Sequence, residues 1–540
     1  MLRDDMRPVI RVIALKLLAF SVHSGAFRRA PRAYLIACWW YLRGKRLRAR
    51  NQFAPLLGAS SGAFQLWRLR NAARPAPIGG GYVPIVALID AHGGGSIEAT
   101  LQSLDAAGIA AIVVDGPHAR DGAGLLERLP GPLQDIWLMP LYAGDRVARG
   151  AAAAYVGAIA EAEPDAALIY ADDDIIDPNG HSHTRPHFKP AWNAELFCHF
   201  DYLSGSCILR ARTTEIGAVE GGADWVARLV HAVADRTHPV RLTEILHHRQ
   251  RRPRKTPIAP LTIVRDALPP VTVIVPTRNR ADLLAVCLDG LAATQYPGFD
   301  TIVVDNGSDE PEALALLAQI DGRSCRVLRH AGPFNFSAIN NRAVAEADGR
   351  MICMLNNDVE IAQRDWLAIL AMQAGRSDVG AVGPRLLYPD GRIQHAGVVL
   401  GVGGGAAHAH RLQDPEEEGY FWRHALPQFT SAVTAACLVV LRERFLEVGG
   451  LDAQAFAVAF NDVDLCMKLN ARGWRSLYEP RATLVHHESL SRGFDKDPVG
   501  AARLARELAA LKSRWATDHR SDPFHHPDLS RFSEQFVVGL

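Results

Sequence analysis

The sequence predicts an α/β protein in which two tandem copies of one largely parallel sheet follow a helical N-terminal segment. First, a strand–helix–strand pattern starts after each of two linkers rich in Gly or Pro, at 71–82 and 251–270. Such alternation is typical of parallel sheets with both faces covered. Second, the chain has 540 residues, of which 48% are hydrophobic, enough for more than one core. We expect four parts: a helical segment with its linker at 1–80, a first copy at 81–250, a linker at 251–270, and a second copy with a C-terminal helix at 271–540.

Positive charge is concentrated in the first part. Residues 1–74 contain thirteen Arg and two Lys against Asp4 and Asp5, a formal net charge of +13, although the whole chain carries only +1. The near-neutral total argues against a nucleic-acid-binding protein, whereas a basic block of this kind suits an anionic lipid surface. The apolar stretches "VIRVIALKLLAF" and "AYLIACWWYL" are interrupted or short, so we expect neither to span a bilayer.

Two interpretations of residues 1–50 remain. They can contact an anionic membrane interface, with Trp39 and Trp40 at headgroup depth and the following arginines on the lipid phosphates, or they can form a helical hairpin packed on the neighbouring domain. The eight cysteines occur singly, without a CxxC pair, which is typical of reduced cysteines in a cytoplasmic protein. We therefore expect a cytoplasmic protein, peripheral on the inner face of the cell membrane if the segment binds lipid. Its oligomeric state is left open.

Each copy begins with the same secondary structure pattern. In the first copy we expect a strand at 83–90, a helix at 96–107 and a strand at 110–116. In the second we expect a strand at 271–276, a helix at 282–293 and a strand at 301–308. A last amphipathic helix, 500–515, is predicted to pack on the second copy without a chemical role.

Further similarities indicate a duplication with a shorter first copy. We align "LIYADDD" (168–174) with "MICMLNND" (351–358), and "ADWVARLVHA" (223–232) with "NDVDLCMKLN" (461–470). The interval from the last acid of each strand to the later His pair is 73 residues in the first copy and 128 in the second.

Polar residues end three strands of the second copy, where parallel sheets bind nucleotides. The first strand runs into a helix start suited to a phosphate, the second ends on an acid that can accept hydrogen bonds from a base or ribose, and the third ends on oxygen donors suited to a hard divalent cation. Singly, each could be a turn or helix-capping residue; together they indicate a site. In order, the residues are Pro276, Thr277, Arg278 and Asn279; Asp305; and Asn356, Asn357 and Asp358.

Three later positions are candidates as well. Asp462 starts an amphipathic helix, where it can act chemically or stabilise the helix dipole. "VHHESLSRG" combines bases, an acid and a cation: His486, His487, Glu488 and Arg492. A Gly-rich loop between 393 and 410 offers three substrate contacts: His395, His408 and His410.

The second copy resembles glycosyltransferase family 2, the inverting enzymes of GT-A fold. The matching strings are "VIVPTRNR", "VVDNGSDE", "FNFSAINNRAVAEADG", "MLNNDVEI", "GPRLLYPDGRIQHAGVVLG", "AACLVVLRERFLEVGGLD", "NDVDLCMKL" and "LVHHESLSRG". The rhamnosyl- and galactofuranosyltransferase-like members are the most similar. The resemblance implies a Rossmann-like mixed sheet in two tandem copies plus the N-terminal helical segment.

The resemblance also implies roles for individual residues. The general base is Asp462, and the metal, Mn²⁺ or Mg²⁺, is held by Asp358, Asn356 and His486. It also implies that Pro276, Thr277, Asn279 and Asp305 hold the nucleotide. From the residues themselves we further expect Arg278 and Asn341 at the nucleotide, and His395, His487, Glu488 and Arg492 on the acceptor side.

The sequence departs from the family pattern in both copies. In the second, Asn356–Asp358 keep one carboxylate at the family's DxD position, and Arg278 stands where an aromatic residue is common. In the first, the strand "VALIDAHGGG" lacks the nucleotide-binding turn, although an acidic cluster at 172–174 survives. Two interpretations of the first copy follow: a degenerate domain that shapes an acceptor site or a dimer, or a second active transferase.

These observations predict an enzyme, a hexosyltransferase, that moves a sugar from a nucleotide-diphosphate donor to a glycan or lipid-linked glycan acceptor of a surface polysaccharide. The alternative is a non-catalytic scaffold that binds sugar nucleotides or polysaccharides. A dinucleotide-dependent oxidoreductase is disfavoured, because neither first strand leads into a GxGxxG turn.

Overall fold

The computed structural model describes residues 8–71, 83–116, 120–252, 254–322, 325–488 and 497–540. The chain divides into two compact units. The first contains residues 1–193, 200–256 and 538–540, and the second contains 194–199 and 257–537. A short helix inside the expected first copy, α9 (Ala194–Phe197), therefore belongs to the second unit.

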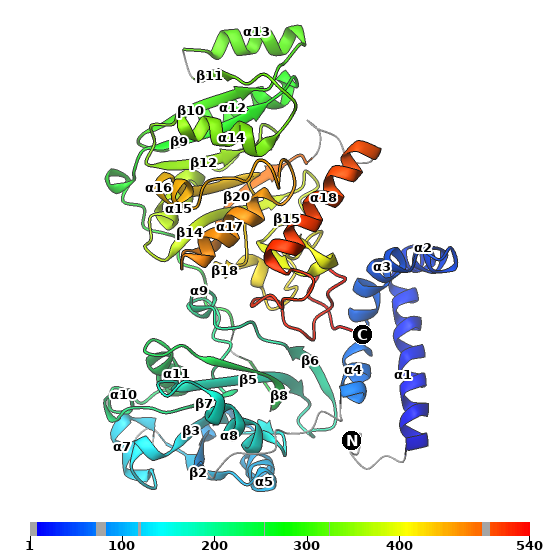
Figure 1. Cartoon of the computed structure of the whole chain (residues 1–540). Helices are drawn as coiled ribbons and strands as arrows, with labels where there is room; N and C mark the ends of the chain where they lie inside the picture. Colours follow the sequence, from blue (N-terminus) through cyan, green and yellow to red (C-terminus); the bar gives the residue numbers. More distant parts are fainter. Residues whose placement is uncertain (1–7, 72–82, 117–119, 253, 323–324, 489–496) are drawn as a thin grey trace. The chain divides into compact units, whose positions relative to one another are not determined.

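Four helices begin the first unit: α1 (Pro8–Arg29), α2 (Pro31–Leu42), α3 (Arg46–Gly58) and α4 (Ala63–Asn71). Figure 1 shows α4 beside β6 (His183–His187) of the sheet, and the Gln65 side chain donates a hydrogen bond to the His183 carbonyl oxygen at 3.0 Å. The stretch Ile10–Arg29 is long and apolar enough to cross a membrane by length and composition, and only 11% of it is buried. The helix continues through Arg11 and Lys16, which interrupt the apolar run in the sequence. The expectation that neither apolar stretch spans a bilayer stays a prediction.

The first unit is built on one mixed sheet. Its strand order is β2–β1–β3–β7–β5–β8–β4, with β6 paired to β5. The strands are β1 (Ile85–Asp90), β2 (Ala110–Val114), β3 (Trp137–Tyr142), β4 (Arg146–Val147), β5 (Leu168–Ile176), β7 (Cys207–Leu209) and β8 (Val240–Arg249). The helices are α5 (Ile97–Ala107), α7 (Gly122–Arg128), α8 (Ala151–Glu161), α10 (Thr213–Gly217) and α11 (Trp225–Ala234).

The second unit has a larger sheet of the same kind. Its order is β11–β10–β9–β12–β19–β14–β20–β13, with β15 on β14 and β18 on β20, and β16 pairs with β17 apart from it. The strands are β9 (Val271–Thr277), β10 (Phe299–Asp305), β11 (Arg326–Arg329), β12 (Met351–Leu355), β13 (Val359–Glu360), β14 (Val379–Leu387), β15 (Ile393–His395), β16 (Val398–Leu400), β17 (Ala406–His408), β18 (Gln428–Thr430), β19 (Cys437–Leu441) and β20 (Arg475–His486).

Helices cover both faces of this second sheet, as Figure 1 shows. Strand residues alternate between the faces, so that Val273 and Val275 join one core and Ile274 the other. The first core includes residues of α12 (Ala281–Ala292), α13 (Pro311–Ile320) and α15 (Trp366–Ala374). The second includes residues of α14 (Phe336–Ala345), α16 (Arg442–Glu447), α17 (Asn461–Ala471) and α18 (Pro498–Trp515).

The two sheets share one topology. Each strand on the main path of the first sheet has a counterpart at the same position in the second. The order β2–β1–β3–β7–β5–β8–β4 corresponds to β10–β9–β12–β19–β14–β20–β13. Each neighbouring pair also runs in the same relative direction in both units. The duplication predicted from the sequence therefore has a structural counterpart.

The predicted alignment of the acidic residues was wrong. The strand that carries Asp172–Asp174 is β5, which takes the place of β14 and not of β12. The counterpart of Asp358 is Asp145: three residues separate β3 from β4, as three separate β12 from β13. The next residue then opposes a histidine of the long strand in each unit, Arg146 opposite His248 and Val359 opposite His486. The sequence misled because both units contain several buried strands with polar residues near one end.

Candidate active site

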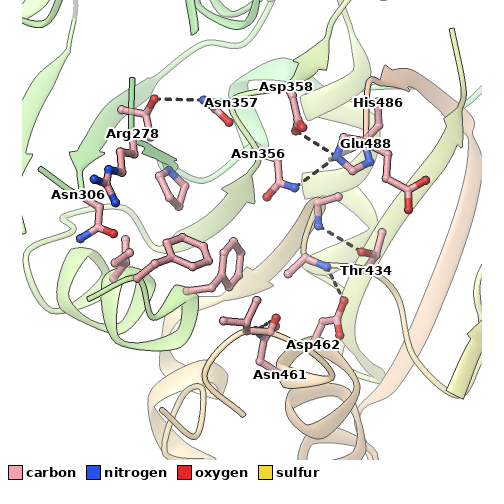
Figure 2. A pocket seen from close by; sticks show the side chains of 18 of the residues that line it. Arg278, Asn306, Asn356, Asn357, Asp358, Thr434, Asn461, Asp462, His486 and Glu488 are labelled. Atoms are coloured by element: carbon pink, nitrogen blue, oxygen red, sulfur yellow. Dashed lines mark hydrogen bonds and ion pairs between the residues drawn. The ribbon is translucent and has the colours of Figure 1, made fainter. Parts of the chain in front are cut away.

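The ends of β9 and β12 open into a cavity of about 680 Å³ that is lined only by residues of the second unit. Its size is in the range typical of sites for small molecules. Figure 2 shows side chains from several segments, distant in sequence, around this space. Predicted site residues that line it are Pro276, Thr277, Arg278, Asn356, Asn357, Asp358, His408, Asp462, His486 and Glu488.

One wall carries side chains of types that can ligate a metal. Nε2 of His486 lies 3.1 Å from Oδ1 of Asp358 and 3.3 Å from Nδ2 of Asn356. The antiparallel pairing of β13 with β20 brings these residues together, because it sets Val359 opposite His486. On its other side, the His486 ring is held by Gln394, with 2.7 Å between Nδ1 and Oε1. This contact orients the imidazole toward the carboxylate.

The electrostatics of this wall favour an ionised Asp358. Burial raises the pKa of a carboxyl, but the hydrogen bond and the charge offered by His486 outweigh it, so that the pKa of Asp358 is lowered. An ionised carboxylate, an amide oxygen and an imidazole form a donor set that fits a divalent cation whose remaining ligands come from substrate phosphates.

Asp462 lies on a different part of the cavity wall. Figure 2 shows it apart from Asp358 and His486, with Thr434 between them. It occupies the first turn of α17, where its carboxylate accepts hydrogen bonds from the amides of Ala435 at 3.1 Å and Val463 at 2.8 Å. Burial raises the pKa of Asp462, and these hydrogen bonds offset only part of that effect. A carboxylate with a raised pKa is a stronger proton acceptor.

Three residues predicted to bind nucleotide do not line the cavity. Asn279 joins two loops, because its side chain bonds Asp309 and Glu310. Asp305 is buried at the end of β10, where its carboxylate accepts from Ser308 and pairs with Arg329. The neighbouring residue Asn306 lines the cavity instead.

The third, Asn341, lies within α14. Its amide forms hydrogen bonds in both directions with the backbone of Leu451, at 2.7 and 2.9 Å. This side chain therefore fixes a loop and contributes no atom to the cavity wall.

Two of the predicted acceptor residues also lie outside the lining. His395 is fully buried, with 3.0 Å between its Nδ1 and that of His408, which does line the cavity. His487 is turned to Glu360, with 3.1 Å between Nε2 and Oε2. Glu488 does line the cavity, while Arg492 lies outside the described residues.

Further lining residues were not predicted. Asn306 and Gln394 lie within strings that resemble the family but were not singled out, whereas no such string contains the other three residues. The five are Asn306, Gln394, Arg411, Thr434 and Arg503. Arg503 belongs to α18, which we expected only to pack. The helix does pack on the second core, through Leu511, and its periodicity gave no sign that Arg503 would line the cavity.

The corresponding strand ends of the first unit are closed by arginines. Asp145, the counterpart of Asp358, is buried beside Arg249, with 3.8 Å between Oδ2 and Nε. Burial raises the pKa of Asp145 to about 7 although Arg249 opposes the shift. At the end of β1, Asp90 pairs with the buried Arg120 at 3.2 Å. The guanidinium groups of Arg249 and Arg120 thus lie at the strand ends that correspond to the cavity wall of the second unit.

Comparison with known proteins agrees with this geometry. Residues 272–418, which lie in the second unit, match the family model described as glycosyl transferase family 2. Together with the mixed sheet, this confirms the predicted GT-A α/β fold.

Three curated proteins illustrate the similarity. The uncharacterized protein y4gI of Sinorhizobium fredii is 40% identical over 430 residues, 71% of this chain and 47% of its own length. The O-antigen biosynthesis protein RfbC of Myxococcus xanthus is 36% identical over 416 residues, 68% of this chain and 32% of its own. The N-acetylglucosaminyl-diphospho-decaprenol L-rhamnosyltransferase of Mycobacterium tuberculosis is 25% identical over 232 residues, 38% of this chain and 71% of its own. The chain spans about half or less of the first two relatives.

Proposed function

We propose that the second unit is an inverting glycosyltransferase that moves a sugar from a nucleotide-diphosphate donor to a hydroxyl group of a glycan or lipid-linked glycan. One observation carries the proposal: a single cavity contains both Asp462, whose pKa is raised, and the separate pair Asp358–His486. Inverting transfer needs these two parts, a base for the acceptor and a positive centre for the departing diphosphate.

Asp358, Asn356 and His486 would hold the cation, Mn²⁺ or Mg²⁺. Such cations bind proteins through one or two carboxylates and complete their shells with substrate phosphates and water, which fits a wall with one ionised carboxylate. When bound, the cation supplies neutralisation of the charge on the leaving diphosphate.

Asp462 takes the proton of the acceptor hydroxyl. The acceptor oxygen then forms a bond to the anomeric carbon on the face opposite the diphosphate, while the carbon–oxygen bond to the diphosphate breaks and its electron pair leaves with the phosphate. One displacement inverts the configuration at that carbon. The amides of Ala435 and Val463 hold the carboxylate in one orientation during this transfer.

The donor and the acceptor are proposed to lie at different parts of the wall. Thr277 ends β9, Arg278 follows it, and Asn306 follows β10. The guanidinium group of Arg278 can pair with a diphosphate. His408 and Glu488 suit a sugar acceptor, because burial lowers the pKa of His408 to about 4 and leaves a neutral hydrogen-bonding ring. The names of two relatives, an O-antigen biosynthesis protein and a rhamnosyltransferase acting on a lipid diphosphate, support a glycan or lipid-linked acceptor.

The first unit is proposed to be a non-catalytic copy of the same fold. Asp145 and Asp90 have Arg249 and Arg120 as partners, and a guanidinium group competes with a metal or a nucleotide for the same carboxylate.

The N-terminal helices are proposed to contact the cytoplasmic face of an anionic membrane. Large apolar side chains are exposed on α1 and α2, among them Phe20 at 74% and Leu42 at 84%. Arginines stand over the neighbouring indole rings, Arg43 over Trp39 and Arg48 over Trp40. Binding to vesicles with anionic lipid should weaken as salt rises; equal binding to neutral vesicles would contradict the electrostatic part of this proposal.

A donor screen tests the enzymatic proposal. The full chain is heated with each of a panel of nucleoside-diphosphate sugars, with and without Mn²⁺ or Mg²⁺, and the stabilising donor is then assayed for release of nucleoside diphosphate. We expect stabilisation by a donor only with the metal, and release that is lost in Asp462→Asn. Donor binding without any release, with or without glycan acceptors, would favour a binding scaffold instead.

A further inference from the structure

A second group of metal-ligating side chains lies in the first unit, outside every residue used above for catalysis. It consists of Asp174, His183 and His248, one from each of the adjacent strands β5, β6 and β8. The register accounts for the juxtaposition, since Asp174 is paired with His248 across β5 and β8, and the β5–β6 hairpin returns His183 to the other side of β5. Three paired strands form a rigid base for such a group.

The distances are close to those of a coordination shell. Each oxygen of the Asp174 carboxylate lies 2.8 Å from the Nδ1 atom of one of the two histidines, and the ligand atoms of all three residues lie within 4.8 Å of one another. Ligand atoms that share a zinc ion lie about 3–3.5 Å apart, given bonds of about 2.0–2.2 Å. Small side-chain movements therefore suffice to admit an ion.

Within the acidic stretch 172–174, Asp174 differs from its neighbour Asp173 in the side chains with which it forms ion pairs. Its neighbour Asp173 is matched by cations, with Lys189 at 2.9 Å and Arg252 at 2.5 Å. Asp174 is fully buried, and among the described residues it forms ion pairs with the two histidines. A buried carboxylate is costly without a positive partner, and a metal ion provides one.

The histidines are suited to ligation and are reachable from solvent. Their side chains are 13% and 19% exposed for His183 and His248, so that solvent can supply a further ligand.

We propose that Asp174, His183 and His248 bind one divalent cation of the late first transition row, represented by Zn²⁺. Two imidazoles and one carboxylate favour such a cation over Mg²⁺, which prefers oxygen ligands throughout. The bound ion ties the β5–β6 hairpin to β8 and stabilises the first unit. This assignment is independent of the function proposed for the second unit.

The test is a Zn²⁺ titration of the full chain after treatment with a chelator, with a chromophoric competitor for free metal. We expect one tight site in the wild type and an affinity at least about 100-fold lower in His183→Ala and in His248→Ala, the scale of losing support for a bound metal. Asp174→Asn serves as a variant that preserves shape, and circular dichroism checks that each variant is folded. Co²⁺ in place of Zn²⁺ should give visible absorption bands in the wild type that are absent in His248→Ala.

Two controls locate the site. His181→Ala removes an exposed histidine two positions from His183 and should leave the affinity unchanged. Asp358→Ala alters only the cation-binding wall of the second unit and should leave this Zn²⁺ site intact. The proposal is overturned if the folded His183→Ala and His248→Ala variants bind Zn²⁺ as the wild type does. It is also overturned if the wild type binds Zn²⁺ no more tightly than a variant that carries both His183→Ala and His248→Ala. The three side chains would then be a hydrogen-bonded cluster without metal.

Discussion

The two units share a strand order but differ in what faces the aspartate that follows the strand β3 or β12. In the second unit, Asp358 faces a histidine and an amide at an open cavity. In the first, Asp145 is buried beside Arg249. The same sheet can therefore present either a binding wall or a closed ion pair, and the choice is made by a few side chains at the strand ends and not by the fold.

The largest expected difference between the units concerns Asp462. Asp462→Asn should lower the rate of sugar transfer by about 10²–10⁴, the usual scale for a general base, while the donor still binds. The matched control is Asp224→Asn, at the start of α11 in the first unit, which should leave the rate unchanged. Similar losses in both variants would contradict a single catalytic unit.

The second expected effect is on metal binding by the paired aspartates. Asp358→Ala should weaken Mn²⁺ binding by about 10–100-fold, measured by electron paramagnetic resonance of free Mn²⁺ in the presence of donor. Asp145→Ala should leave this binding unchanged because Arg249 occupies the corresponding place. A loss of Mn²⁺ binding in the Asp145 variant would contradict the claim that only the second unit binds this metal ion.

A smaller effect is expected at the nucleotide side. Arg278→Ala should weaken donor binding about tenfold, which corresponds to one charge-assisted hydrogen bond. Arg120→Ala, at the equivalent edge of the first unit, should not change it, since Arg120 pairs with Asp90. Isothermal titration with the same donor checks both variants.

The last expected difference is in stability: the two aspartates should give pH dependences of opposite sign. The pKa of Asp145 is raised to about 7, so its contribution to stability is complete below about pH 4 and is lost as the pH rises toward neutrality. Relative to Asp145→Asn, the free energy of unfolding of the wild type should fall by at most about 1.4 kcal/mol per pH unit over that window.

Asp358 should behave in the opposite way. Because its pKa is lowered, its contribution is present above the ordinary carboxyl pKa and is lost as the pH falls. Denaturant unfolding at several pH values, with Asp358→Asn beside Asp145→Asn, measures both. If the contributions of Asp145 and Asp358 to the free energy of unfolding changed with pH in the same direction, the described difference between their surroundings would be contradicted.

The sequence was sufficient for the elements and for the central part of the site. Hydrophobic periodicity located the helix expected at 282–293, found as α12 at Ala281–Ala292, because its apolar stripe is a local property. The strand-end residues Thr277, Asn356 and Asp358 and the distant residues Asp462 and His486 do line one cavity.

Other parts of the site depend on contacts that a single sequence does not contain. Asp305 and Asn341 form hydrogen bonds or ion pairs with loops, through Ser308 and Leu451, and these partners were not foreseeable from spacing. The repeat was misaligned because several apolar strands of the first unit contain or precede acids, among them β3 before Asp145 and β5 with Asp174. The strand order and the pairing of β4 with β8 distinguish these two.

The central claim is that one of the two similar sheets binds the donor, and the number of donor sites on the full chain tests it most directly. Isothermal titration with the stabilising sugar nucleotide and Mn²⁺ should give one site per chain, which is lost in Asp358→Ala and kept in Asp145→Asn. Two sites per chain, or one site that survives Asp358→Ala and disappears in Asp145→Asn, would contradict the account.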